Sequence, residues 1–155
     1  MQKAALILEG GAKRGVFTSG VLDYLMEQEY YISHVIGVSA GSCNAVDYVS
    51  RQPGRTKACM IRSGEDGKII NFHNFFQTKS LLDMDLIFER DPKELHPFDF
   101  DAYFASDMTC EIVVTNCESG QAEYYSEKED GDRLMQLCRA SSSMPLVTPM
   151  VEIDG

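Results

Sequence analysis

The chain has 155 residues and a formal net charge of −10, with 14 Lys and Arg against 24 Asp and Glu. That length suits one domain, and 44% hydrophobic with 25% charged residues is an ordinary globular composition, so a wholly disordered chain is excluded. The acidic charge argues against a nucleic-acid partner and against tight docking on an anionic membrane. No apolar run approaches the ~20 residues of a membrane span, so no stable membrane insertion is expected.

The first residues and the cysteines indicate the compartment. Met1-Gln2-Lys3 leads straight into an apolar run, which is not the pattern of a signal peptide. The number of cysteines is odd and no two of them have CxxC spacing, so neither a disulfide framework nor a zinc site is predicted. We therefore expect a cytoplasmic protein with reduced thiols at Cys43, Cys59, Cys110, Cys117 and Cys138.

The first third of the chain alternates apolar strands with glycine-rich turns. Residues 4–8 form a short continuous apolar run, as expected of a buried parallel strand, and lead into the loop 9–15. From residue 16 to about residue 30, apolar side chains recur at helical spacing. A second apolar strand at 34–38 precedes a small-residue turn and a helical stretch through residue 48. This βαβα order predicts a parallel sheet with right-handed crossovers.

The middle of the chain has weaker signals. Gln52-Pro53-Gly54 ends the second helix. Short helical turns are predicted at 80–83 and 85–88, and we expect Asp91-Pro92 and His96-Pro97 to interrupt them.

The last third is clearer. Residues 110–117 are predicted to form a strand, and a turn at 118–121 returns the chain as a hairpin partner over 122–126. A helix is predicted over 130–140. A last strand is expected from residue 149 into the Asp-Gly dipeptide at 154–155, which is a hairpin-turn signal.

The segment Gly37-Val38-Ser39-Ala40-Gly41 fits G-x-S-x-G, the nucleophile-elbow pattern. Small residues flank the serine because the sharp turn from strand to helix leaves no room for side chains. Such a turn projects the hydroxyl above the sheet at the N-terminus of the next helix, where the helix dipole favours negative charge. A Gly-Ser turn without chemistry stays open as the alternative.

The glycine-rich loop 10–15 also lies between a predicted strand and a predicted helix, so its amides can converge on an anion. A Walker A loop is excluded, because Val16-Phe17 follows the loop instead of Lys and Ser or Thr. A dinucleotide fingerprint is disfavoured, since Ala12 replaces its middle glycine and no carboxylate ends the second strand. The third interpretation is an oxyanion hole for the alkoxide that forms when Ser39 attacks an ester.

A serine nucleophile needs a base. The α/β-hydrolase fold would use a histidine and several strands before its elbow, but here the elbow follows a single βα unit. We expect none of the three histidines, His34, His73 and His96, to act as the base. A carboxylate acting directly on the serine is the remaining option.

Together, the loop Glu9–Phe17 and the elbow Gly37–Gly41 resemble the patatin-like phospholipase family, in its bacterial branch. The resemblance extends over nearly the whole chain, through the segments 95–106, 114–120 and 139–145. It implies a three-layer α/β/α fold with a mainly parallel central sheet. It also implies an enzyme that cleaves acyl esters of lipids through a Ser-Asp dyad.

By this resemblance Ser39 is the nucleophile, and the backbone amides around Gly11 and Ala12 form the oxyanion hole. Ala40 adds a further amide by general elbow geometry, and Arg14 matches the basic position of the family's loop. One departure is Ala12, which stands where the family has a third consecutive glycine, because alanine keeps the N–H but disfavours positive φ. The other motif positions are glycines, namely Gly10, Gly15, Gly37 and Gly41. No cofactor is implied, and no metal, since the histidine and carboxylate spacings fit no known ligand pattern.

The family's acid lies in an Asp-Gly-Gly or Asp-Gly-Ala segment, and Asp154-Gly155 is the tempting match. We favour a hairpin-turn role for Asp154 over the role of dyad base. Residues 1–155 are then the N-terminal part of a single patatin-like domain, incomplete at its C-terminus. A lipid or small acyl ester is the expected substrate, and a non-catalytic scaffold or binding module with this fold is the alternative.

Overall fold

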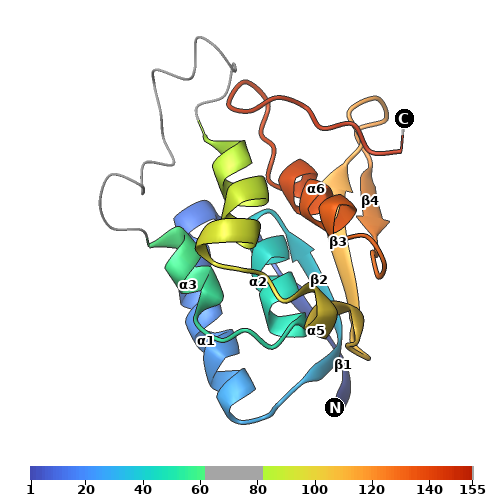
Figure 1. Cartoon of the computed structure of the whole chain (residues 1–155). Coiled ribbons are helices and arrows are strands. Elements are labelled where there is room, and N and C mark those ends of the chain that lie inside the picture. Colours follow the sequence, from blue (N-terminus) through green and yellow to red (C-terminus); the bar gives the residue numbers. More distant parts are fainter. Residues whose placement is uncertain (62–81, 155) are drawn as a thin grey trace.

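The computed structural model describes residues 1–61 and 82–154 and has an α/β architecture (Figure 1). Its strands are β1 (Gln2–Leu8), β2 (Ile32–Val38), β3 (Thr109–Thr115) and β4 (Ala122–Tyr125). They form one sheet in the order β1-β2-β3-β4, in which β1, β2 and β3 are parallel and β4 is antiparallel to β3. The predicted α/β class, the mainly parallel sheet and the hairpin are thereby confirmed.

The helical elements follow the strands closely in sequence, as the βαβα pattern predicts. The helix predicted from residue 16 begins one residue earlier, and the one predicted over 130–140 is shifted by one residue. The elements are η1 (Ala12–Arg14), α1 (Gly15–Glu27), α2 (Ala40–Val49), α3 (Arg55–Met60), the π-helix η3 (Leu86–Leu95), α5 (Phe100–Phe104) and α6 (Gly131–Ser141). None of the helices in the described residues has both the length and the apolar composition of a membrane span.

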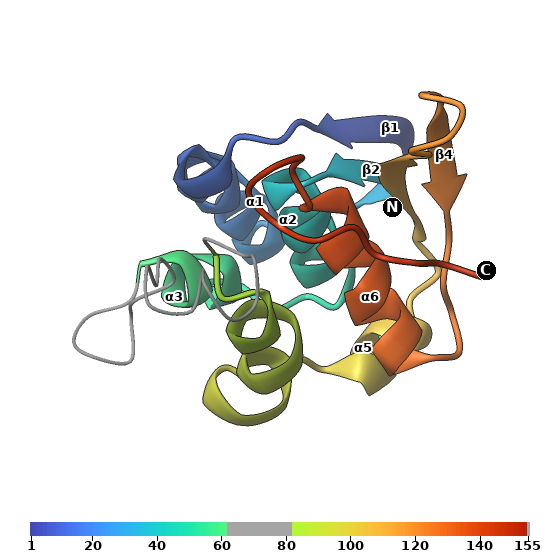
Figure 2. The same ribbon diagram turned by 90° about the horizontal axis from the view of Figure 1, so that it is seen from above.

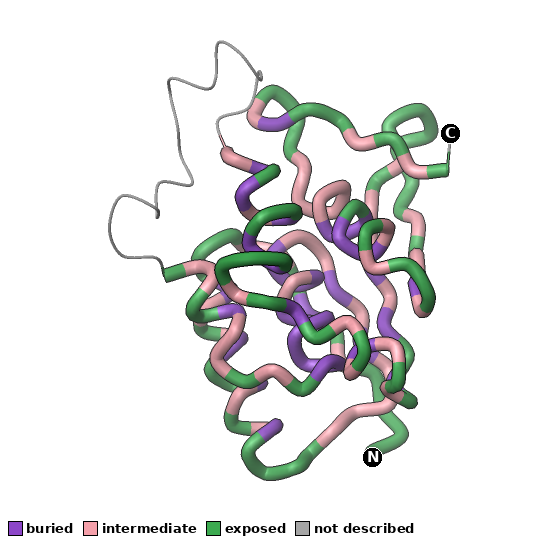
Figure 3. The backbone as a smooth tube through the Cα atoms, in the orientation of Figure 1, coloured by how far each residue is buried: buried purple, intermediate pink, exposed green. Residues whose placement is uncertain are grey.

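The core lies between one face of the sheet and α2 and α6, and Figure 3 shows the buried stretches of the backbone in the interior of the molecule. α2 is the central helix, since it contacts the sheet, α1 and α6 and nearly all of its residues are buried. On the sheet side the core is formed by alternate strand residues, among them Val35, Cys110 and Ile112. The apolar residues of the strands pack against the apolar faces of the helices. This packing positions the turns that connect strands to helices.

All helices in the described residues lie on one side of the sheet (Figure 2). Cross-strand register places Ile7 beside Ile36, and Val113 beside Tyr124, on the opposite face. Ile7 is 74% exposed and Tyr124 is 59% exposed. In the described part of the chain, this second face, called the open face below, has no helical layer.

The helix η3 corrects the sequence prediction for the middle of the chain. We expected Asp91-Pro92 to interrupt the helical turns, but the helix runs through Pro92 to Leu95. Its wider winding replaces the usual hydrogen-bond pattern, as the amide of His96 donating to the carbonyl of Asp91 illustrates. His96-Pro97 does end this helix, as predicted. The turn predicted at 80–83 begins outside the described residues.

The last predicted strand was wrong. Residues 149–154 have no strand partner within the described part of the chain. Instead, Ile153 packs against the core and Asp154 binds Arg133 at the start of α6. These side-chain contacts hold the segment over α6 rather than along the edge of the sheet (Figure 2).

Candidate active site

Ser39 lies between β2 and α2 with φ 54° and ψ −125°, a conformation that L-residues rarely adopt. The neighbouring glycines allow this turn. A Cβ atom at Gly37 would lie 2.5 Å from the carbonyl oxygen of Gly41, and one at Gly41 would overlap the carbonyl oxygen of Leu8. The predicted reason for small residues around the serine therefore matches the geometry of this turn.

Hydrogen bonds hold the backbone of the elbow. The amide of Ser39 donates to the hydroxyl of Ser141 at 2.8 Å, and this hydroxyl donates to the carbonyl of Val113 at 2.6 Å. The carbonyl of Ser39 accepts from the amide and the hydroxyl of Ser42 at 2.8 and 2.6 Å. The Ser39 hydroxyl makes no hydrogen bond within residues 1–61 and 82–154, and the residue is half-buried. Its backbone is fixed while its hydroxyl stays available.

The glycine loop packs directly against this turn. A Cβ atom at Gly10 would lie 3.0 Å from Cβ of Ser39, and one at Gly15 would lie 3.1 Å from Cβ of Ala40. The register of the parallel strands explains this contact, since Leu8 pairs with Gly37 and both loops leave the same edge of the sheet.

The loop has free backbone donors. In the described residues, the amides of Gly11, Ala12 and Ala40 donate no hydrogen bond. Gly11 has φ 150° and Ala12 has φ 49°, so the alanine occupies the left-handed conformation that a glycine would occupy without strain. The Arg14 side chain folds back over Gly11, where its Nε would be 3.3 Å from an added Cβ. A positive charge therefore lies beside these donors.

Two polar residues that were not predicted as part of the site hold its backbone in place through hydrogen bonds. Asn44, which is almost fully buried, donates from Nδ2 to the carbonyls of Gly15 and Ala40 at 3.1 and 3.2 Å. It thus ties the loop to the elbow helix. Ser141 ties the elbow to β3. Asn44 could have been suspected as a polar residue among the small and apolar residues of the predicted helix. No local signal marks Ser141 as a partner of Ser39.

The structure does not bring Asp154 to Ser39. Asp154 forms a two-pronged ion pair with Arg133, with distances of 2.6 and 3.2 Å, and the guanidinium lowers the pKa of the carboxyl group. Arg133 lies near the start of α6, and Ser141, which binds the elbow, is its last residue. The eight residue steps from Arg133 to Ser141 span about 12 Å of α-helix, so Asp154 is bound near the end of α6 that lies opposite to the elbow.

The two histidines in the described residues each pair with a carboxylate rather than with Ser39. His34 Nε2 is 2.7 Å from Oε2 of Glu111 on the open face, and His96 Nδ1 is 2.7 Å from Oδ1 of Asp91. His73 lies outside the described residues. His96 and Asp91 also come close to Cys59, and these three side chains are the ones in the described residues that could hold a metal ion.

A serine lies at a strained strand-to-helix turn of a parallel sheet, beside loop amides that donate no hydrogen bond within residues 1–61 and 82–154. This arrangement resembles the nucleophile elbow of the α/β hydrolases. The family model of the patatin-like phospholipases matches residues 6–155. The chain therefore belongs to the patatin-like phospholipase family, as the motifs predicted, and this family is one of lipid acyl hydrolases.

One curated relative is the uncharacterized protein YjjU of Escherichia coli strain K12. It is 26% identical over 147 residues, which cover 92% of this chain and 40% of the relative. The chain thus spans about 40% of the length of this relative.

Proposed function

We propose that the protein is a serine acyl hydrolase of the phospholipase A type, which cleaves acyl esters of lipids with Ser39 as its nucleophile. The observation that carries this proposal is the contact between the elbow and the glycine loop, where an unbonded serine hydroxyl and unbonded amides share one edge of the sheet. Membership of the patatin-like phospholipase family supports the substrate class.

In the proposed mechanism, the Ser39 hydroxyl gives its proton to a carboxylate base while its Oγ forms a bond to the acyl carbon. The carbonyl electron pair moves to the oxygen, and the resulting alkoxide is stabilised by the amides of Gly11, Ala12 and Ala40. Collapse of this intermediate breaks the ester bond, and the departing alcohol takes up the proton held by the base. Water attacks the acyl-enzyme by the same route and releases the fatty acid and the free serine.

We also propose that the base lies in sequence C-terminal to residues 1–155, which form the N-terminal part of a longer patatin-like domain. Asp154 is bound to Arg133, and the other two Asp-Gly pairs, at 66–67 and 130–131, are followed by neither Gly nor Ala. The uncovered open face of the sheet and the 40% coverage of the relative support the same proposal. On this basis Asp154 is a turn residue.

Labelling with a fluorophosphonate probe and hydrolysis of a short p-nitrophenyl ester test the proposal, in this chain and in a version extended downstream. We expect the extended protein to be labelled and active, the Ser39→Ala variant to be neither, and a Ser119→Ala control in the exposed hairpin turn to match the wild type. An extended protein that is neither labelled nor active on any ester would overturn the enzyme proposal.

A non-catalytic scaffold or binding module is the alternative, and the strained Ala12 in the oxyanion loop is the observation that favours it. The same labelling experiment separates the two, because a scaffold has no reason to keep a reactive Ser39. A cytoplasmic location is also proposed. It is supported by the five cysteines, which form no disulfide bond in the described part of the chain.

A further inference from the structure

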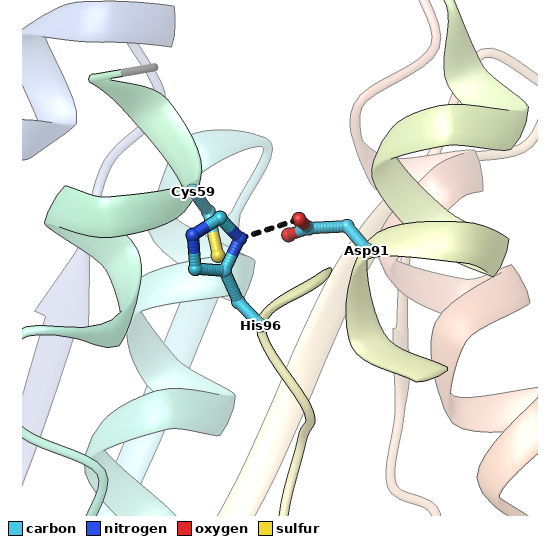
Figure 4. A group of neighbouring side chains, drawn as sticks. All are labelled: Cys59, Asp91 and His96. Carbon is cyan, nitrogen blue, oxygen red and sulfur yellow. Dashed lines mark hydrogen bonds and ion pairs between the residues drawn. The ribbon is translucent and has the colours of Figure 1, made fainter. Parts of the chain in front are cut away.

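Three side chains with metal-binding atoms converge at one place in the fold (Figure 4). Cys59 comes from α3, Asp91 from the π-helix η3, and His96 from the position just after η3. One ligand atom from each lies within 4.8 Å of the other two. Asp91 lies 32 positions after Cys59 in the sequence, which is why no motif indicated this cluster.

The ligand cluster is held in place by its surroundings. The Asp91 side chain is only 2% exposed and bonds to the His96 ring at 2.7 Å. Arg55 donates from Nε to the backbone carbonyl of His96 at 3.0 Å and from Nη1 to Asp47 at 2.7 Å. Asp47 also accepts from the hydroxyl of Thr56 at 2.5 Å. Such outer partners orient metal ligands and limit their motion.

The charges around the cluster suit a divalent cation. Arg55 is paired with Asp47, so these two neutralise each other. The Asp91 carboxylate contributes one negative charge, and His96 contributes a ring nitrogen. Burial raises the pKa of the Cys59 thiol, so Cys59 contributes a second negative charge only when it gives up its proton to a bound ion. A divalent ion would balance the charges of these two ligands.

We propose that Cys59, Asp91 and His96 bind a zinc ion. One sulfur, one imidazole nitrogen and one carboxylate oxygen are the three ligand types of zinc, which also binds water as a fourth ligand at such sites. A thiolate disfavours Mg²⁺ and Ca²⁺, which prefer oxygen ligands. The bound ion joins α3 to η3, and its binding requires no ester hydrolysis at Ser39.

Calorimetric titration of the reduced, chelator-treated chain with Zn²⁺, and with Mg²⁺ in parallel, tests the proposal. We expect one Zn²⁺ per chain, no binding of Mg²⁺ and a raised thermal midpoint with Zn²⁺. Cys59→Ser and His96→Gln should each weaken Zn²⁺ binding by more than about tenfold, because loss of an outer partner alone costs about that much. Cys117→Ser, a change at an exposed cysteine in the hairpin turn, should bind Zn²⁺ like the wild type.

Substitution with Co²⁺ gives a second measurement, since a thiolate ligand produces a charge-transfer absorption that Cys59→Ser should remove and Cys117→Ser should keep. If one ligand variant fails to fold by circular dichroism, the other variant decides. The proposal is overturned if the wild type binds no stoichiometric Zn²⁺. It is equally overturned if the folded ligand variants bind Zn²⁺ as tightly as the wild type, because the three side chains would then form only a hydrogen-bonded cluster.

Discussion

The backbone amide of Ser39 and the side-chain hydroxyl of Ser141 are joined by a hydrogen bond of 2.8 Å, although the two residues are 102 positions apart in the sequence. Because the same hydroxyl also binds the carbonyl of Val113, Ser141 connects the elbow, the end of α6 and β3. The conformation of the proposed nucleophile therefore depends on a residue of a different motif.

Replacing Ser141 by alanine tests this dependence. The change leaves the Ser39 amide and the Val113 carbonyl without their partner, so we expect the free energy of unfolding to fall by about 1–3 kcal/mol. Labelling of Ser39 by a fluorophosphonate in the extended protein should also slow down. Ser142→Ala is the matched control, since the Ser142 side chain makes no hydrogen bond in the described residues. Unchanged stability and labelling in Ser141→Ala would contradict the positioning role.

The second prediction concerns Ala12, whose φ of 49° is strained for alanine. Ala12→Gly removes this strain but makes the unfolded chain more flexible, so we expect a net gain in unfolding free energy of up to about 1 kcal/mol. Chemical denaturation measures it. The control is Ala102→Gly within α5, where the same replacement should destabilise by about 1 kcal/mol. A loss of stability in Ala12→Gly as large as that of the control would show that the loop conformation is different.

A third prediction concerns Glu127, a buried carboxylate just before α6. Burial opposes its ionisation, but three backbone amides and Arg133 donate to it and outweigh burial, so its pKa falls from 4.5 to about 2. Since the pKa is lower in the folded state, the stabilisation is present above about pH 4.5 and is lost as the pH falls toward 2. The full shift corresponds to about 3 kcal/mol.

Denaturation at about pH 6 and about pH 3 measures this contribution. We expect the wild type to lose stability between these values and Glu127→Gln to lose much less over the same range. Glu118→Gln, at an exposed carboxylate of the hairpin turn, should behave like the wild type. A Glu127→Gln variant with the full wild-type pH dependence would exclude Glu127 as its source.

A fourth prediction separates the two roles of Asp154. If Asp154 is a turn residue, Asp154→Asn in the extended protein leaves kcat/KM for the p-nitrophenyl ester nearly unchanged, whereas Ser39→Ala abolishes turnover. Full activity in the 155-residue chain, lost in Asp154→Asn, would instead identify Asp154 as the base. Arg133→Gln is the control for the ion pair, because it frees the Asp154 carboxylate without removing it.

The sequence predicts the elbow and the glycine loop well because their causes are local. Gly37 and Gly41 are required by backbone contacts within a few residues and with the neighbouring strand, so the pattern itself carries the steric information. The strand order also follows from the βαβα alternation, since right-handed crossovers leave few arrangements of neighbouring parallel strands.

Features that depend on distant contacts could not be read in this way. The presence of Pro92 predicts the end of a helix, but the wider π-type winding of η3 accommodates this proline inside the helix. The apolar residues before Asp154 predicted a strand, but packing of Ile153 and the pairing with Arg133 determine their course. The convergence of Cys59 with Asp91 likewise depends on how α3 packs beside η3.

The open face of the sheet bears on how the molecule behaves in solution. Ile7 and Tyr124 expose apolar surface there, and such surfaces on two molecules attract each other at high concentration. The net charge of −10 opposes this contact, since molecules of like charge repel. Added salt screens the repulsion over about 10 Å at 0.1 M but leaves the apolar attraction intact. The colloidal stability of the chain should therefore decrease as ionic strength increases.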